Sequence, residues 1–214
     1  MTIADYFDHA GPDGARAWIA AARHRISADP HEIGVLFPAV GRRCGRELLP
    51  DGARVDDEVR TLLLTWVPLA GADLADLLTE LYRHGDGDEK RAVIRALDSL
   101  DDADHELGDR VLPLIADALR TNDTRLIGAA LGEYAARRLD DSGYRQAVLK
   151  FVFCQIPLAK VAGLDRRADE ELAKMLADFA RERTAAGRPV PADVWPVIAR
   201  FPDLLALVRA AGRT

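Results

Sequence analysis

Residues 118–153 carry the pattern that most constrains the fold of this chain. Apolar residues recur there at helical spacing in two stretches, which the polar turn Asp140-Asp141-Ser142-Gly143 separates. Each stretch opens with polar residues of the kind that cap helix N-termini. The segment therefore predicts two amphipathic helices, with ionisable side chains gathered at their turns.

The same periodicity predicts helices through most of the remaining chain. Helices are expected over residues 13–26, 71–84 and 168–186, and Asp29-Pro30-His31-Glu32 has the N-cap and first-turn proline of a helix start. No stretch shows the two-residue alternation of a strand bounded by turn signals. Aromatic residues make up only 6% of the chain, which also favours helix over sheet. The sequence predicts an all-α protein.

A faint internal repeat suggests how these helices are arranged. Arg83-His84-Gly85-Asp86 and Arg120-Thr121-Asn122-Asp123 share the pattern R-x-x-D at an offset of 37 residues, and helical segments flank both. Such an offset suits repeats made of two helices. We expect an antiparallel stack of helical hairpins, a HEAT-like α-solenoid of about ten helices. One domain is predicted over residues 1–214, with residues 1–12 flexible and short helices in 188–214.

Charge and composition exclude several classes of function. A net charge of −6 argues against general nucleic-acid binding, which needs a basic surface. No apolar run reaches the roughly 18 residues of a membrane span, and no secretory signal is recognised, so a cytoplasmic location is expected. Cys44 and Cys154 stand apart from each other and from histidines, which predicts buried thiols and no zinc site.

Recognisable catalytic motifs are missing from the sequence. It contains no G-x-S-x-G, H-E-x-x-H, G-x-x-x-x-G-K or G-x-G-x-x-G pattern. Its acidic pairs stand at expected helix starts or in connectors, where capping accounts for them. No catalytic residue, metal ligand or cofactor is therefore predicted.

The turns supply the candidate binding residues. In a stack of hairpins, corresponding turns meet along one edge, where arginines, amides and phenols suit an anionic or polyhydroxylated ligand. The alternative is that these side chains only cap helices and pair with one another. The predicted binding residues are Arg42, Arg43, Arg83, Asp86, Arg120, Asn122, Asp123, Arg125, Tyr144, Arg145 and Lys150.

Several of the same strings resemble sequences of the EboA family. The resemblance runs from about Phe37 to Trp195, and its most specific parts are R-T-N-D-T-R at 120–125 and Y-R-Q-A-V-L-K at 144–150. Members are described as metabolite-traffic proteins. Their genes cluster with those of a prenyltransferase-like membrane protein, a TatD-like metal hydrolase and a sugar-phosphate-cyclase-like enzyme. The resemblance implies a role in moving a secondary metabolite and supplies no catalytic residues.

Three functional hypotheses follow. The first is a non-catalytic accessory protein that binds a small polar or anionic metabolite, or a partner protein of the same gene cluster such as the prenyltransferase-like membrane protein. The second is a metal-dependent enzyme acting on a phosphorylated or prenylated intermediate, with Asp86, Asp123 or Asp165 as metal ligands or acid/base groups. The third is nucleic-acid binding by helical repeats, which the acidic charge disfavours.

Overall fold

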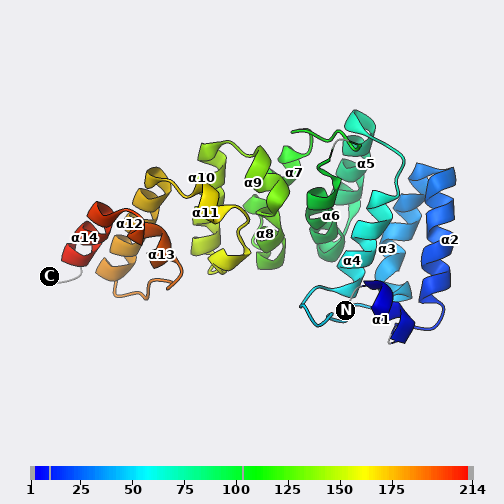
Figure 1. Cartoon of the computed structure of the whole chain (residues 1–214), viewed down its shortest axis with the longest axis horizontal. Coiled ribbons are helices and arrows are strands. Elements are labelled where there is room, and N and C mark those ends of the chain that lie inside the picture. Colours follow the sequence, from blue (N-terminus) through cyan, green and yellow to red (C-terminus); the bar gives the residue numbers. More distant parts are fainter. Residues whose placement is uncertain (1–2, 10, 103, 212–214) are drawn as a thin grey trace. The chain divides into compact units, whose positions relative to one another are not determined.

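The computed structural model describes residues 3–9, 11–102 and 104–211, and within them it contains fourteen α-helices, two short 3-10 helices and no strand. The all-α prediction is confirmed. The chain divides into two compact units, Met1–Ala130 and Leu131–Thr214, which are described separately (Figure 1). The HEAT-like repeat and the single domain stay predictions.

In the first unit, the even-numbered helices α4, α6 and α8 pack side by side in a row, and the odd-numbered helices α3, α5 and α7 each pack against the helix that follows (Figure 1). Its elements are α1 (Ile3–His9), α2 (Ala15–Ala28), η1 (Pro30–Glu32), α3 (Ile33–Arg43), α4 (Val55–Thr65), α5 (Gly71–His84), α6 (Gly87–Leu100), α7 (Leu112–Arg120) and α8 (Thr124–Ala130).

Apolar side chains at helical spacing hold this row of helices together. Val59 and Leu63 of α4, Val93 and Leu97 of α6, and Ile127 of α8 are all fully buried. Burying a side chain of this size stabilises the fold by roughly 1.5–3 kcal/mol relative to leaving it in water. The packing fixes the three helices against one another, so the residues at their N-termini come together at one edge.

Both R-x-x-D turns have the structural role that their pattern predicts. Arg83 and Arg120 lie in the last turns of α5 and α7. Asp86 caps α6 in a capping box, in which its carboxylate accepts the Glu89 N–H at 2.9 Å. Asp123 comes just before α8 and accepts the Arg125 N–H at 2.9 Å. The aspartates therefore begin the second helix of each hairpin.

In the second unit, α12 packs against α10, α13 and α14. Phe151 of α10 and Leu172 and Leu176 of α12 are fully buried there. The elements are α9 (Glu133–Arg138), α10 (Asp141–Phe153), η2 (Leu158–Lys160), α11 (Leu164–Arg167), α12 (Glu170–Ala185), α13 (Val194–Ala199) and α14 (Pro202–Ala211). Buried Tyr144 donates its hydroxyl to the Ala162 carbonyl at 2.7 Å.

The first helix expected in residues 118–153 is interrupted where the prediction had it continuous. Helix α8 stops at Ala130 and α9 starts at Glu133, with Gly132 in an extended conformation. The carbonyl of Leu131 accepts the Ala162 N–H at 2.9 Å instead of a helical donor. This contact between segments far apart in sequence, together with the poor helix propensity of glycine, accounts for the break.

Other details also differ from the expectations. Short helices raise the number from about ten to fourteen among the described residues. Residues Ile3–His9, expected to be flexible, form α1, whereas residues 1, 2 and 10 of that stretch lie outside the described part. Cys44 is buried as predicted, but Cys154 is only half-buried.

Candidate anion-binding site

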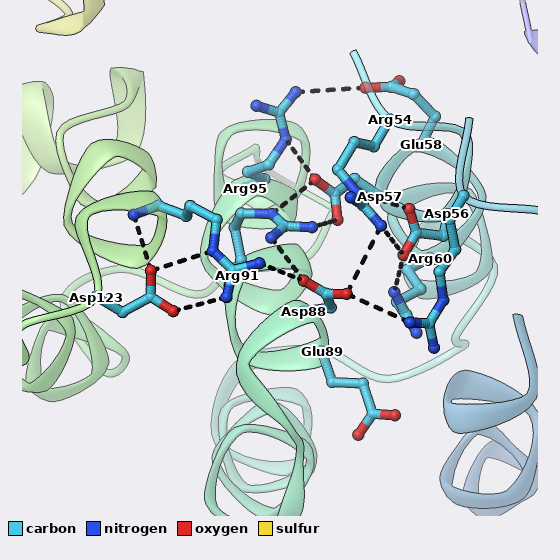
Figure 2. A network of polar contacts seen from close by, with 12 residues as sticks. Arg54, Asp56, Asp57, Glu58, Arg60, Asp88, Glu89, Arg91, Arg95 and Asp123 are labelled. Carbon is cyan, nitrogen blue, oxygen red and sulfur yellow. Dashed lines mark hydrogen bonds and ion pairs between the residues drawn. The ribbon is translucent and has the colours of Figure 1, made fainter. Parts of the chain in front are cut away.

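A network of charged side chains joins the N-terminal turns of α4, α6 and α8 and the segment before α4 (Figure 2). We call it the rim network. It contains six arginines and five carboxylates, which gives a formal charge of +1 in a chain of net charge −6. Its members are Arg46, Arg54, Asp56, Asp57, Glu58, Arg60, Asp88, Arg91, Arg95, Asp123 and Arg125.

The inner part of the rim network is buried and fully paired. Arg60 donates to the Asp56 carboxylate at 2.8 Å and to the Phe37 carbonyl at 3.2 Å. Arg91 donates to both carboxylate oxygens of Asp57, each at 2.9 Å, and so joins α6 to α4 (Figure 2). Buried charges are tolerated only when they are paired in this way. These side chains form a fixed base for the more exposed arginines around them.

Asp88 is the point on which the arginines converge. Its carboxylate lies 2.8 Å from Arg91, 3.3 Å from Arg125, 3.6 Å from Arg54 and 3.8 Å from Arg46. Burial alone would raise the pKa of Asp88, but the hydrogen bond from Arg91 and the neighbouring positive charges outweigh it and lower the pKa. Asp88 is therefore ionised at neutral pH, and one negative charge faces four guanidinium groups.

Three of the arginines remain open to solvent. The side chains of Arg46, Arg95 and Arg125 are 52%, 43% and 60% exposed. A guanidinium has five N–H donors, and the contact of Arg46 with Asp88 at 3.8 Å is too long for a hydrogen bond. Donors at this edge can thus reach a carboxylate or phosphate from solvent in the forked geometry that arginine favours.

Three of the residues predicted from the sequence belong to this edge. Arg125 lies 3.0 Å from Asp123 and 3.3 Å from Asp88, and the Asp123 hydrogen bond is the main reason why its pKa is raised. A Cβ added at Gly87, next to Asp86, would lie 3.5 Å from the Asp123 carboxylate. The turns before α6 and α8 are therefore adjacent, although Asp86 itself is occupied in capping α6.

Two other predicted arginines are engaged within their own helices. Arg83 lies 4.0 Å from Glu80 of α5, and Arg120 lies 3.1 Å from Asp117 of α7. All four side chains are largely exposed. Pairs of this kind contribute little to stability, and neither arginine has a described contact with the rim network.

Arg42, Arg43 and Asn122 are exposed on the first unit. In the described part of the chain, Arg42 and Arg43 form no ion pair at the end of α3. Their binding role stays a prediction.

The predicted residues of the second unit are organised around its own contacts. Arg145 donates from Nε and Nη2 to the Asp169 carboxylate, with Nη2 at 2.5 Å, and this bond raises the pKa of Arg145. Tyr144 is committed to the Ala162 carbonyl, and burial raises its pKa to about 12. Lys150 is half-buried. The first two side chains therefore fix α10 to the chain that follows it.

Sequence reasoning missed most of the rim network, including Arg54, Arg91 and Arg95. A usable signal was present in the spacing. The pairs Glu58–Arg95 and Asp88–Arg125 both join residues 37 positions apart, which is the offset of the R-x-x-D repeat. When an acidic residue stands in the first turn of one helix and an arginine follows 37 positions later, the spacing indicates an ion pair between two helices that pack side by side, such as α4 and α6.

The residues named for the enzymatic hypothesis do not come together as a metal site in the described part of the chain. No three His, Cys, Asp or Glu side chains are placed there to hold a metal ion. Asp86 caps α6, Asp123 is held by Arg125, and Asp165 is exposed in the first turn of α11 in the second unit. The enzymatic hypothesis stays a prediction.

The fold and the site define an all-helical protein whose candidate site is made of arginines held by carboxylates at helix starts. The model of one family, described as metabolite traffic protein EboA, matches residues 15–199. The chain belongs to the EboA family, and the predicted resemblance is confirmed. This membership indicates a role in metabolite traffic. Neither curated proteins nor solved structures gave a match.

One structural finding bears on the expected absence of a membrane span. Among the helices of the described residues, none has both the length and the apolar character needed to cross a bilayer.

Proposed function

We propose that this protein is a non-catalytic accessory of metabolite traffic that binds a small anionic metabolite at the rim network. Family membership supports the general role. The observation that carries the binding proposal is the convergence of Arg46, Arg54, Arg91 and Arg125 on the single carboxylate of Asp88. Asp56, Asp57 and Asp123 pair with three of these arginines, but the rim network keeps a formal charge of +1, and Arg46 lies too far from Asp88 for a hydrogen bond, so the edge attracts a further negative charge.

The buried pairs support the preorganisation of such a site. Arg91 is held by Asp57 and Asp88, and Arg54 is held by Asp56 at 3.0 Å, so these side chains lose little freedom when an anion arrives. Arg46 and Arg125 are more exposed and supply the solvent-facing donors. A ligand with a phosphate or two carboxylates matches forked donors of this kind.

Titration calorimetry at low ionic strength tests the proposal with three probes: inorganic pyrophosphate, citrate and choline. We expect both anions to bind and choline to give no heat at the rim. The variant Arg46→Gln/Arg125→Gln should bind the anions about tenfold more weakly, because it removes two charge-assisted contacts at an exposed site. Raising the salt concentration should weaken binding further, since exposed charges are screened.

Arg181→Gln is the matched control, because Arg181 forms an exposed pair with Asp178 of α12 at 3.1 Å outside the rim network. It should bind the anions like the unaltered protein. Equal affinity of the double variant and the unaltered chain for the anions would refute the site, as would choline binding that the double variant weakens as much as it weakens citrate binding. A tetraglutamate peptide is titrated in the same way. If it binds and both small anions fail to bind, the small-metabolite proposal is refuted in favour of an acidic segment of a partner protein.

A further inference from the structure

A cavity in the first unit has the opposite electrostatic character to the rim network. Its volume is about 570 Å³, and residues of α3 and α5 supply most of its lining. The apolar part of the lining includes Phe37, Pro38, Leu77 and Leu81. This volume falls in the usual range of small-molecule sites, about 300–1,000 Å³.

The charged part of the lining is acidic. Asp73, Asp76 and Glu80 lie on successive turns of α5, and Glu89 of α6 adds a fourth carboxylate. The lining residues include no lysine or arginine. In Figure 2, Glu89 points away from the rim network. The cavity is therefore distinct from the candidate anion site in both its residues and its charge.

Two of these carboxylates have no partner among the residues that the structure describes. Glu80 lies 3.2 Å from His84, and Glu89 accepts the Asp86 N–H at 3.1 Å. Asp73 and Asp76 form neither an ion pair nor a side-chain hydrogen bond within the described residues. Unpaired carboxylates beside an apolar wall attract a positive charge that is attached to an apolar body.

A glycine keeps one wall of the cavity open. Gly34 is the second residue of α3, and a Cβ added there would meet no atom within 4 Å. A larger side chain at this position would extend into unoccupied space beside the lining residues. Replacing Gly34 by a larger residue should therefore fill the cavity without disturbing the buried core.

We propose that the cavity between α3 and α5 binds a small organic cation, an ammonium group joined to an apolar body. A metal ion is disfavoured because no three ligating side chains are suitably placed among the described residues. The apolar lining takes the body of the ligand, and Asp73 and Asp76 hold its ammonium group. This site is independent of the anion site proposed above.

Octylamine and octanoate are suitable probes because they share an apolar chain and carry opposite charges at pH 7. Binding to the full chain is measured by calorimetry, and amide chemical shifts locate the site. Octylamine should shift amides of α3 and α5 and bind at least about tenfold more tightly than octanoate, as expected when two carboxylates face one charge. Asp73→Asn/Asp76→Asn should remove this preference, and these exposed positions tolerate the change.

Gly34→Leu should weaken both probes by occupying the cavity, while Gly34→Ala should change binding less. Arg46→Gln/Arg125→Gln should leave octylamine binding unchanged, which separates this result from the test of the anion site. The proposal is overturned if neither probe binds, if octanoate binds as well as octylamine, or if the aspartate variant keeps its preference. A basic amphipathic peptide that binds the cavity when octylamine does not would also overturn it, in favour of a protein partner.

Discussion

Replacing Arg91 by methionine tests whether the buried layer of the rim network holds α4 and α6 together. The substitution keeps an apolar chain in place but leaves Asp57, whose side chain is 4% exposed, without its bidentate partner. Breaking a buried ion pair from one side costs about 3–5 kcal/mol. Arg95 lies 3.8 Å from the same carboxylate and compensates in part, so we take the lower end, about 3 kcal/mol.

The double variant Asp57→Leu/Arg91→Met measures the net contribution of the ion pair to stability without the cost of leaving one buried charge unpaired. With both charges gone, no carboxylate remains at position 57, and Asp88, which also loses Arg91, keeps Arg54 and Arg125 as neighbours, so the free energy of unfolding should lie within about 1 kcal/mol of the unaltered protein. The single variant Asp57→Leu completes the double-mutant cycle, and the coupling energy is the cost of the double variant minus the costs of the two single variants. A large destabilisation in Arg91→Met that the second change restores is the expected pattern.

Urea unfolding followed by far-UV circular dichroism gives these free energies. Because the chain has two compact units, hydrogen exchange of residues 55–65 and 87–100 shows whether the loss falls on α4 and α6. Arg181→Gln, which removes an exposed pair, should cost below about 0.5 kcal/mol. A cost below about 1 kcal/mol for Arg91→Met, or a double variant no more stable than the single one, would refute the reasoning.

Three further predictions follow from the same contacts. The pKa of Asp88 is lowered in the folded protein, so its ionised form stabilises the fold above about pH 4, the pKa of an unfolded aspartate, and this contribution is lost as the pH falls through the folded pKa. In Asp88→Asn, the free energy of unfolding should therefore fall less steeply as the pH is lowered below about 4. Burial raises the pKa of Cys44 to about 12, so Ellman's reagent should label half-buried Cys154 first and Cys44 only in urea, and the reverse order would contradict this. Tyr144→Phe removes the hydroxyl bonded to the Ala162 carbonyl and should cost about 1–2 kcal/mol in urea unfolding, whereas an unchanged midpoint would show that this bond does not stabilise the second unit.

Local sequence patterns were sufficient to predict the helices and most of their ends. Asp86 and Glu89 three positions later spell out the capping box that the structure contains, and α5 spans the predicted residues 71–84. These features depend on residues within one turn of each other, so the linear spacing contains the information. The interruption after Ala130 was not predicted, because a hydrogen bond from distant Ala162 to Leu131 helps to create it.

The candidate site was predictable only in part. Asp123 and Arg125 were expected at an edge where turns meet, and the structure places Arg125 between the carboxylates of Asp123 and Asp88. Arg83 and Arg120 were expected in the same cluster because they share the R-x-x-D pattern, yet each pairs within its own helix. The pattern specifies the turn, but it does not specify the direction in which a long exposed side chain points.

By itself, the sequence determined that the chain is helical, where most hairpin turns fall, and to which family it belongs. Only the tertiary structure decided that Arg91 joins Asp57 across 34 positions and that four arginines surround Asp88. Helix formation follows from contacts within a few residues, whereas these ion pairs depend on the rotation and register of α4, α6 and α8. The burial of apolar side chains between those helices sets both quantities.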